Sequence, residues 1–157
     1  MEDERIQSPA CGRILEIAST EWDPGVKGPL TRISIFLSLW DDHTTRAPIG
    51  GRIDETRYSP GKFGIALFKK NLTKNENNLI GIEGKTARLA VRQISGRIAR
   101  RILCACRVND SVEQGQKLGA IQFGSCVQLY LPTDARLCVA VGQKVWGGKT
   151  TMAFFKR

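Results

Sequence analysis

The chain has 157 residues, a net charge of +9, a hydrophobic fraction of 41% and a charged fraction of 25%. These values fit a single domain over residues 1–157 that buries its own core, and they exclude a low-complexity chain. The longest uncharged apolar stretch, residues 33–40, is too short to cross a bilayer, and the polar N-terminus has no signal-peptide core. We therefore expect a cytoplasmic protein.

Short segments separated by glycine and proline predict an all-β fold, with one or two short helices at most. The expected architecture is a small barrel or sandwich that resembles a barrel-sandwich hybrid. Alternating apolar positions predict strands at 13–19, 33–39, 52–58, 86–94, 129–131 and 137–141. Residues 96–103 fit a helix and a strand equally, and the Asn-rich stretch 69–78 is interpreted as a solvated loop.

A short pattern occurs twice near the C-terminus. Gly115-Gln116 is followed by Lys-Leu, and Gly142-Gln143 is followed by Lys-Val. The repetition predicts that both sites share one type of tight turn. Such turns are typical of biotinyl–lipoyl carrier domains, but the Met-Lys-Met or Asp-Lys-Ala tip of a carrier is missing.

The five cysteines show no metal-ligand spacing, and His43 is the one histidine, so we expect reduced thiols and no metal site. The +9 charge could attract nucleic acid, an anionic membrane or an anionic substrate. We expect no nucleic-acid partner, because aromatic residues make up 7% of the chain and form no evident stacking platform. A lone histidine is usually a satisfied polar residue, and a Gly-Ser pair such as Gly124-Ser125 is usually just a turn.

Taken in order, however, the motifs resemble the phosphatidylserine decarboxylase family in its short prokaryotic form. The resemblance runs nearly from end to end. It is carried by S-P-A-C-G-R-I at 8–14, H-T-T-R-A-P-I-G-G at 43–51, Y-S-P-G-K-F at 58–63, N-E-N at 75–77, I-S-G-R-I-A-R-R-I at 94–102, G-Q-K-L-G-A-I-Q-F-G-S at 115–125, L-Y-L-P at 129–132 and V-G-Q-K-V-W-G-G-K-T at 141–150.

The resemblance implies a proenzyme that cleaves itself between Gly124 and Ser125. The products would be a β chain, 1–124, and an α chain, 125–157, whose first residue becomes a pyruvoyl group. This cofactor would form a Schiff base with an amine-bearing carboxylate, either phosphatidylserine-like or a soluble amino-acid or peptide derivative, and release CO2. His43 would donate a proton or bind the carboxylate, Arg46 and Phe123 would bind substrate, and no metal would be needed.

Departures from the family pattern leave a second interpretation of the function open. The family's S-P-x-D-G aspartate, which serves self-cleavage, is replaced here by Cys11, and the Arg-Val-Asp that commonly follows the serine is replaced by Cys126-Val127-Gln128. A cysteine acts as a base only as thiolate. The alternative is therefore an uncleaved, non-enzymatic relative that binds an anionic ligand or partner. In either case we expect a homo-oligomer and peripheral contact with an anionic membrane.

Overall fold

The computed structural model describes residues 4–23, 26–38, 40–61, 75–96, 102–122 and 124–155. Within these ranges every regular element is a β-strand, so the all-β prediction is confirmed. The same ranges contain no helix that is long and apolar enough to span a membrane.

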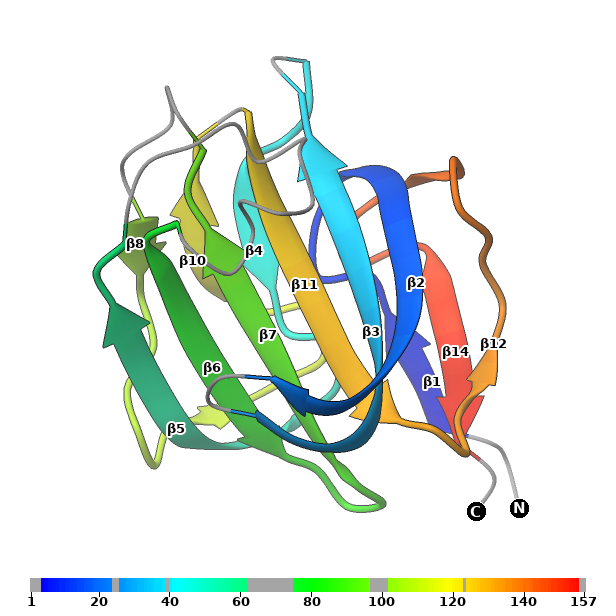
Figure 1. Cartoon of the computed structure of the whole chain (residues 1–157). Helices are drawn as coiled ribbons and strands as arrows, with labels where there is room; N and C mark the ends of the chain where they lie inside the picture. The colour runs from blue at the N-terminus through cyan, green and yellow to red at the C-terminus, as the bar shows by residue number, and fades with distance from the viewer. Residues whose placement is uncertain are drawn as a thin grey trace.

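Eight antiparallel strands form one curled sheet, which dominates Figure 1. Their order across the sheet is β13-β2-β3-β11-β7-β6-β5-β9. The bounds are β2 Gly12–Asp23, β3 Val26–Leu37, β5 Gly51–Ser59, β6 Asn77–Glu83, β7 Arg88–Ile94, β9 Ser111–Val112, β11 Ser125–Pro132 and β13 Lys144–Val145. Strand β11 is therefore central, hydrogen-bonded to β3 on one side and β7 on the other.

Two three-stranded sheets complete the fold. One has the order β1-β14-β12 and the other the order β4-β10-β8. Their bounds are β1 Glu4–Gln7, β4 Thr44–Arg46, β8 Ile102–Cys104, β10 Lys117–Ile121, β12 Arg136–Leu137 and β14 Thr151–Phe155. The first and last described residues, Glu4 of β1 and Phe155 of β14, pair with each other. Both strands lie at the right of Figure 1.

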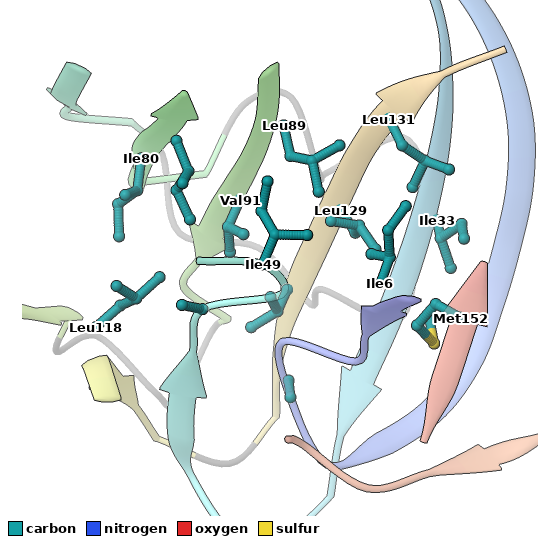
Figure 2. Packing of buried hydrophobic residues seen from close by; sticks show 14 of the residues in the cluster. Ile6, Ile33, Ile49, Ile80, Leu89, Val91, Leu118, Leu129, Leu131 and Met152 are labelled. Atoms are coloured by element: carbon teal, nitrogen blue, oxygen red, sulfur yellow. The ribbon is translucent and has the colours of Figure 1, made fainter. Parts of the chain in front are cut away.

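The hydrophobic core fills the concave side of the large sheet. Figure 2 shows Leu129 and Leu131 of β11 and Val91 of β7 on the same side as Ile6 of β1 and Met152 of β14. All five side chains are fully buried. Burial of β-branched and leucine side chains from all three sheets is the main stabilising contribution.

Side-chain alternation along β11 decides which residues face the core. Val127, Leu129 and Leu131 belong to the main core cluster, whereas Tyr130 packs in a separate cluster on the other face. Because successive side chains in a strand point to opposite faces, Ser125 faces the core side. It stands at the first position of β11 and is completely buried.

Most predicted strands are present, with different lengths. Strand β2 extends the segment predicted at 13–19, and β5 and β11 contain those at 52–58 and 129–131. Strand β3 begins earlier than the segment predicted at 33–39 and ends at Leu37, and β7 begins two residues after the start of the segment predicted at 86–94. The prediction for 137–141 is wrong beyond Leu137, because the chain there leaves β12 and approaches the turn at Gly142. Of the helix-or-strand segment 96–103, residues 97–101 lie outside the described residues, and Ile102 begins strand β8.

The solvated-loop interpretation of 69–78 is wrong where the structure describes it. Residues 69–74 lie outside the described residues, but Asn75 and Asn78 are buried. Asn75 Nδ2 donates to the carbonyl of Ser95 at 2.7 Å, and Asn78 Nδ2 donates to Gln93 Oε1 at 3.2 Å. An amide side chain can be buried when it has such partners, which composition alone does not reveal.

The predicted shared turn is confirmed. Gly115 and Gly142 have φ values of 85° and 89°. In each turn the following glutamine donates its backbone N–H to the carbonyl three residues earlier, at 3.0 Å for Gln116 and 3.2 Å for Gln143. Each glutamine side chain also accepts the N–H of that earlier residue, at 2.9 and 3.1 Å. Glycine at the third position, with positive φ, is what a type II turn requires.

Candidate active site

The Gly124–Ser125 bond lies where the chain enters the central strand. Gly124 has a φ of 74°, in the left-handed region that favours glycine, and its N–H donates to the carbonyl of Leu37 at 2.7 Å. The Ser125 hydroxyl donates to the carbonyl of Gln122. The hydroxyl is therefore held at a tight turn directly beside the bond expected to break.

Gly96 leaves room for the carbonyl of this bond. A Cβ atom at position 96 would lie 2.0 Å from the carbonyl oxygen of Gly124. Any larger residue would have to displace that oxygen, because the contact is with backbone. Gly96 belongs to the I-S-G-R-I motif, but the motif alone does not predict that this glycine contacts the Gly124–Ser125 peptide.

His43 is positioned by the chain segment that leads into the cleavage bond. Its carbonyl accepts the N–H of Ile121, the last residue of β10, at 3.0 Å. The next residue, Gln122, supplies the carbonyl that accepts the Ser125 hydroxyl. Pairing of β4 with β10 thus brings His43, some 80 positions earlier in the sequence, to the same end of the sheet as Ser125.

A cavity of about 380 Å³ opens beside Asp42, the residue before His43. Its lining residues come from four separate segments: Cys11, Asp42, Arg46, Gly115, Trp146, Gly147, Gly148 and Lys149. Two predicted site residues, Cys11 and Arg46, are therefore brought together. The predicted residue Phe123 lies outside the described residues.

Arg46 is fixed across the cavity by backbone contacts. Its Nη1 donates to the carbonyl of Gly115 at 3.0 Å, and a Cβ at Gly148 would lie 3.1 Å from its Cδ. Lys149 on the same wall is exposed. Two cationic side chains in one cavity favour an anionic ligand such as a carboxylate or phosphate.

Hydrogen bonds hold two acidic side chains in the loop that borders the cavity. Hydrogen bonds from the backbone and hydroxyl of Thr44 hold the pKa of Asp42 below its ordinary value, with a smaller contribution from Arg46. Asp41 pairs with Lys144 and accepts hydrogen bonds from the Ser38 N–H at 2.7 Å and hydroxyl at 2.9 Å. Both carboxylates, Asp41 and Asp42, are therefore fixed in position by hydrogen bonds.

Comparison with known proteins decides the family. The sequence profile described as phosphatidylserine decarboxylase matches residues 1–153. A protein of Carboxydothermus hydrogenoformans named phosphatidylserine decarboxylase proenzyme is 42% identical over 99% of this chain and 74% of its own length. A protein of the same name from Desulfotalea psychrophila is 41% identical over 92% of this chain and 68% of its own length. The chain belongs to the phosphatidylserine decarboxylase family. No solved structure matched it.

Within this phosphatidylserine decarboxylase family member, Cys11 lies two strands away from Ser125. Gly12 packs against Phe36 of β3, and the next residue of β3, Leu37, pairs with Ser125 of β11. Two strand spacings amount to roughly 10 Å, which is longer than any hydrogen bond. Cys11 Sγ instead accepts the N–H of Gly147 at 3.1 Å. In this arrangement the thiol contributes to the cavity wall and does not contact the cleavage bond.

The two other departures from the family pattern lie on the opposite face of β11. Cys126 is buried against Ile94, and Gln128 Nε2 donates to the hydroxyl of Ser34 at 3.2 Å. Gln128 Oε1 also accepts the Tyr130 hydroxyl at 2.7 Å. Because alternate residues face opposite sides of a strand, these positions point away from the side of Ser125. Their identity therefore matters for the outer face of the sheet more than for the cleavage chemistry.

The described part of the chain contains no cluster of three or more His, Cys, Asp or Glu side chains that could hold a metal ion. Sequence reasoning missed Gly96, Trp146 and Lys149 as parts of this region. The only sequence signals for them were the quoted family motifs at 94–102 and 141–150.

Proposed function

We propose that this protein is a self-cleaving, pyruvoyl-dependent decarboxylase acting on an amine-bearing carboxylate of the phosphatidylserine type. The observation that carries the proposal is the arrangement at Gly124–Ser125 in a chain of this family. A left-handed glycine precedes a fully buried serine whose hydroxyl is held at the turn, and Gly96 leaves space for the scissile carbonyl.

Self-cleavage follows from nucleophilic attack within the chain. Ser125 Oγ attacks the carbonyl carbon of Gly124, its proton leaves, and the C–N bond breaks to give an ester and a free amine. Loss of the Ser125 α-proton expels the Gly124 carboxylate and leaves dehydroalanine. Addition of water then releases ammonia and gives the keto group. The glycine conformation at 124 supports this step because the residue lies in a turn, directly before the ladder of β11 begins.

The site fits the group that would form there. Ser125 and the residues after it pair with Leu37 through Leu30 of β3, and Cys126 to Tyr130 also pair with β7. These ladders would hold the new chain end in place after the cut. A pyruvoyl group supplies a ketone that binds a primary amine covalently and accepts electrons as the carboxylate leaves.

The residues around this position would bind and protonate the substrate. His43 is proposed to return a proton to the carbon that has lost CO2, or to hold the carboxylate before it leaves. Arg46, together with Lys149, is proposed to bind an anionic group of the substrate in the cavity. A substrate that carries a negative phosphate as well as its amine would suit these cationic side chains.

The test is release of CO2 from phosphatidylserine labelled in the serine carboxyl, with glycerophosphoserine and free serine as soluble competitors. The wild-type protein should release label, and Ser125→Ala should release none because no keto group forms. His43→Ala should lower kcat by roughly 100-fold or more. Ser111→Ala, an exposed serine in β9, is the matched control. Turnover by Ser125→Ala at the wild-type rate would disprove the mechanism.

A second function is favoured by one specific observation. Cys11 stands at the family's aspartate position, and its sulfur is engaged with the Gly147 N–H. If the chain does not cut itself, the cationic cavity would serve an uncleaved protein that binds an anionic ligand. Two measurements separate the cases. Calorimetric titration of Ser125→Ala with glycerophosphoserine detects ligand binding, and the CO2 assay of the wild-type protein detects turnover. Binding without turnover supports only this second function.

A further inference from the structure

A pair of thiols lies at the end of strand β8, apart from the groups that the proposed decarboxylation uses. Cys104 is the last residue of β8, Cys106 follows it by two positions, and their sulfur atoms are 3.7 Å apart. Neither belongs to the described lining of the cavity around Arg46. Two thiols at this distance can react with each other, which a single cysteine cannot do.

The two thiols differ in exposure. Cys104 is exposed at the end of β8, the outer strand of the sheet β4-β10-β8, and Figure 1 shows this strand at the edge of the molecule. Cys106 is buried, with 8% of its surface exposed, and belongs to the main core cluster. A dissolved reagent therefore meets the Cys104 sulfur first, and the Cys106 sulfur lies directly behind it.

The contact between the thiols makes Cys104 the more reactive of the two. A hydrogen bond from the Cys106 thiol, with a smaller one from Asn78, lowers the pKa of Cys104 to about 6. The same contact raises the pKa of Cys106, which therefore keeps its proton while Cys104 is charged. Once the Cys104 sulfur is bonded to a reagent, its charge is gone and no longer opposes ionisation of Cys106.

We propose that Cys104 and Cys106 form a redox-active dithiol site that exchanges with low-molecular-weight disulfides. The Cys104 sulfur bonds to one sulfur of the reagent, the S–S bond of the reagent breaks, and the thiolate that leaves is protonated by water. Cys106 then loses its proton to water and attacks the Cys104 sulfur, which expels the second reagent thiolate. Two protein thiols are oxidised to a disulfide, and one reagent disulfide is reduced to two thiols.

The local structure allows this disulfide to close. A disulfide bond is about 2.0 Å long, so the sulfur atoms, now 3.7 Å apart, must approach each other by about 1.7 Å. Cys106 lies beyond the end of β8, although the N–H of Ala105 still donates to the carbonyl of Leu118 at 2.7 Å. We expect rotation of the exposed Cys104 side chain to provide most of the movement. Because this sulfur is exposed, reducing thiols can reopen the bond.

The test follows both cysteines in one peptide. Trypsin cleaves after Arg101 and Arg107 and releases the segment 102–107, which contains Cys104, Cys106 and no other cysteine. The reduced, full-length protein is incubated with oxidised glutathione, blocked with N-ethylmaleimide under denaturing conditions and digested. The wild-type segment should be lighter than the dithiol by two hydrogens and carry neither glutathione nor the blocking group. Dithiothreitol before blocking should restore two blocked thiols.

Removal of either thiol should stop the reaction at a defined stage. Cys106→Ala should retain one glutathione on Cys104, because the thiol that displaces it is missing. Cys104→Ser should leave Cys106 as a free thiol, because a buried sulfur does not meet the reagent. Cys138 is an internal control, since it is exposed and its thiol donates to the carbonyl of Arg136 at 3.8 Å. It should form at most a mixed disulfide. Urea unfolding of the reduced variants checks that they are folded.

Two results would overturn the proposal. One is a wild-type segment that retains glutathione on Cys104 while Cys106 stays free, since Cys106 would then not displace the adduct. The other is a wild-type segment in which both thiols remain unmodified while Cys138 reacts. The exchange needs no keto group, so Ser125→Ala should form the same disulfide as the wild-type protein. Loss of the proposed decarboxylase activity would therefore leave this site standing, and loss of the disulfide would leave the activity standing.

Discussion

Glycine is needed at two positions around the Gly124–Ser125 bond. Gly124 needs a positive φ, and nothing lies within 4 Å of a Cβ built on it. Gly96 needs no unusual φ, but a Cβ there would lie 2.0 Å from the Gly124 oxygen. The two glycines therefore serve different physical purposes, one conformational and one steric, and substitution can tell them apart.

Gly96→Ala and Gly124→Ala should differ in their effects on cleavage. Gly96→Ala should stop fragment formation and lower the free energy of unfolding by about 1–3 kcal/mol, because the scissile carbonyl must move. Gly124→Ala should cost about 1–2 kcal/mol from backbone strain alone and leave slow cleavage. Stability is measured by urea unfolding in the uncut Ser125→Ala background, and cleavage on denaturing gels. Identical behaviour of the two variants would contradict the assigned roles.

The cysteines differ in the pKa of their thiols and therefore in their expected reactivity. The sequence predicted reduced thiols and did not distinguish Cys104 and Cys106, which are separated by one residue. Their sulfur atoms lie 3.7 Å apart, with Cys104 exposed and Cys106 buried. A hydrogen bond from the Cys106 thiol lowers the pKa of Cys104 to about 6, and the same contact raises the pKa of Cys106. Burial raises the pKa of Cys126 to about 12.

Alkylation of Cys104 should therefore proceed at neutral pH. The thiolate is the reactive form, so the rate should rise with pH and reach half its maximum near pH 6. Cys106→Ala removes the donated hydrogen bond and should move the midpoint up toward about 8.5. The rates are measured with iodoacetamide and mass mapping, with Cys104→Ser as control. A wild-type midpoint near that of a free cysteine would refute the assigned contact.

At the scale of elements, the two glycine–glutamine turns set the cavity walls. The turn at Gly115 carries a carbonyl that holds Arg46, and the turn at Gly142 leads through Lys144 into Trp146. Each turn starts a short strand, β10 or β13. The same type of turn occurs twice, and both turns contribute to the walls of one cavity.

Disruption of the second turn should cost stability. Gly142→Ala should lower the free energy of unfolding by about 1–2 kcal/mol, because alanine is strained at a φ of 89°. Gln143→Ala should cost about 0.5–1 kcal/mol through loss of the exposed hydrogen bond to Ala140 N. Val141→Ala, an exposed neighbour, should change stability by less than about 0.5 kcal/mol. Denaturant unfolding checks all three, and an unaffected Gly142→Ala would contradict the turn assignment.

Local pattern predicted the strands better than it predicted the site. Alternation located β2, β3, β5, β7 and β11, and the repeated Gly-Gln pair located two turns, because both depend on neighbouring residues. Burial of Asn75 depends on a carbonyl twenty positions away, and the fit of Gly96 against Gly124 depends on strand pairing. Such long-range contacts leave no periodic signal in one sequence. The family motifs supplied Ser125, His43 and Arg46, which composition alone would have dismissed.

At the scale of the whole molecule, the proposed cut would not separate the two products. The segment 125–157 contributes β11 to the centre of the large sheet, β13 to its edge, and β12 and β14 to the sheet that holds β1. Removing it would break the ladders with β1, β2, β3 and β7. We therefore expect the fragments to elute together under native conditions and to part only on unfolding.

The most direct measurement is the intact mass of the purified, unfolded protein. A cut chain should give one fragment of residues 1–124 and a second of residues 125–157 that is lighter than the unmodified peptide by one ammonia, because the serine amine is lost as the keto group forms. Ser125→Ala should give the intact chain alone. A wild-type protein that releases CO2 while showing only the full 17.4 kDa chain would contradict the central claim.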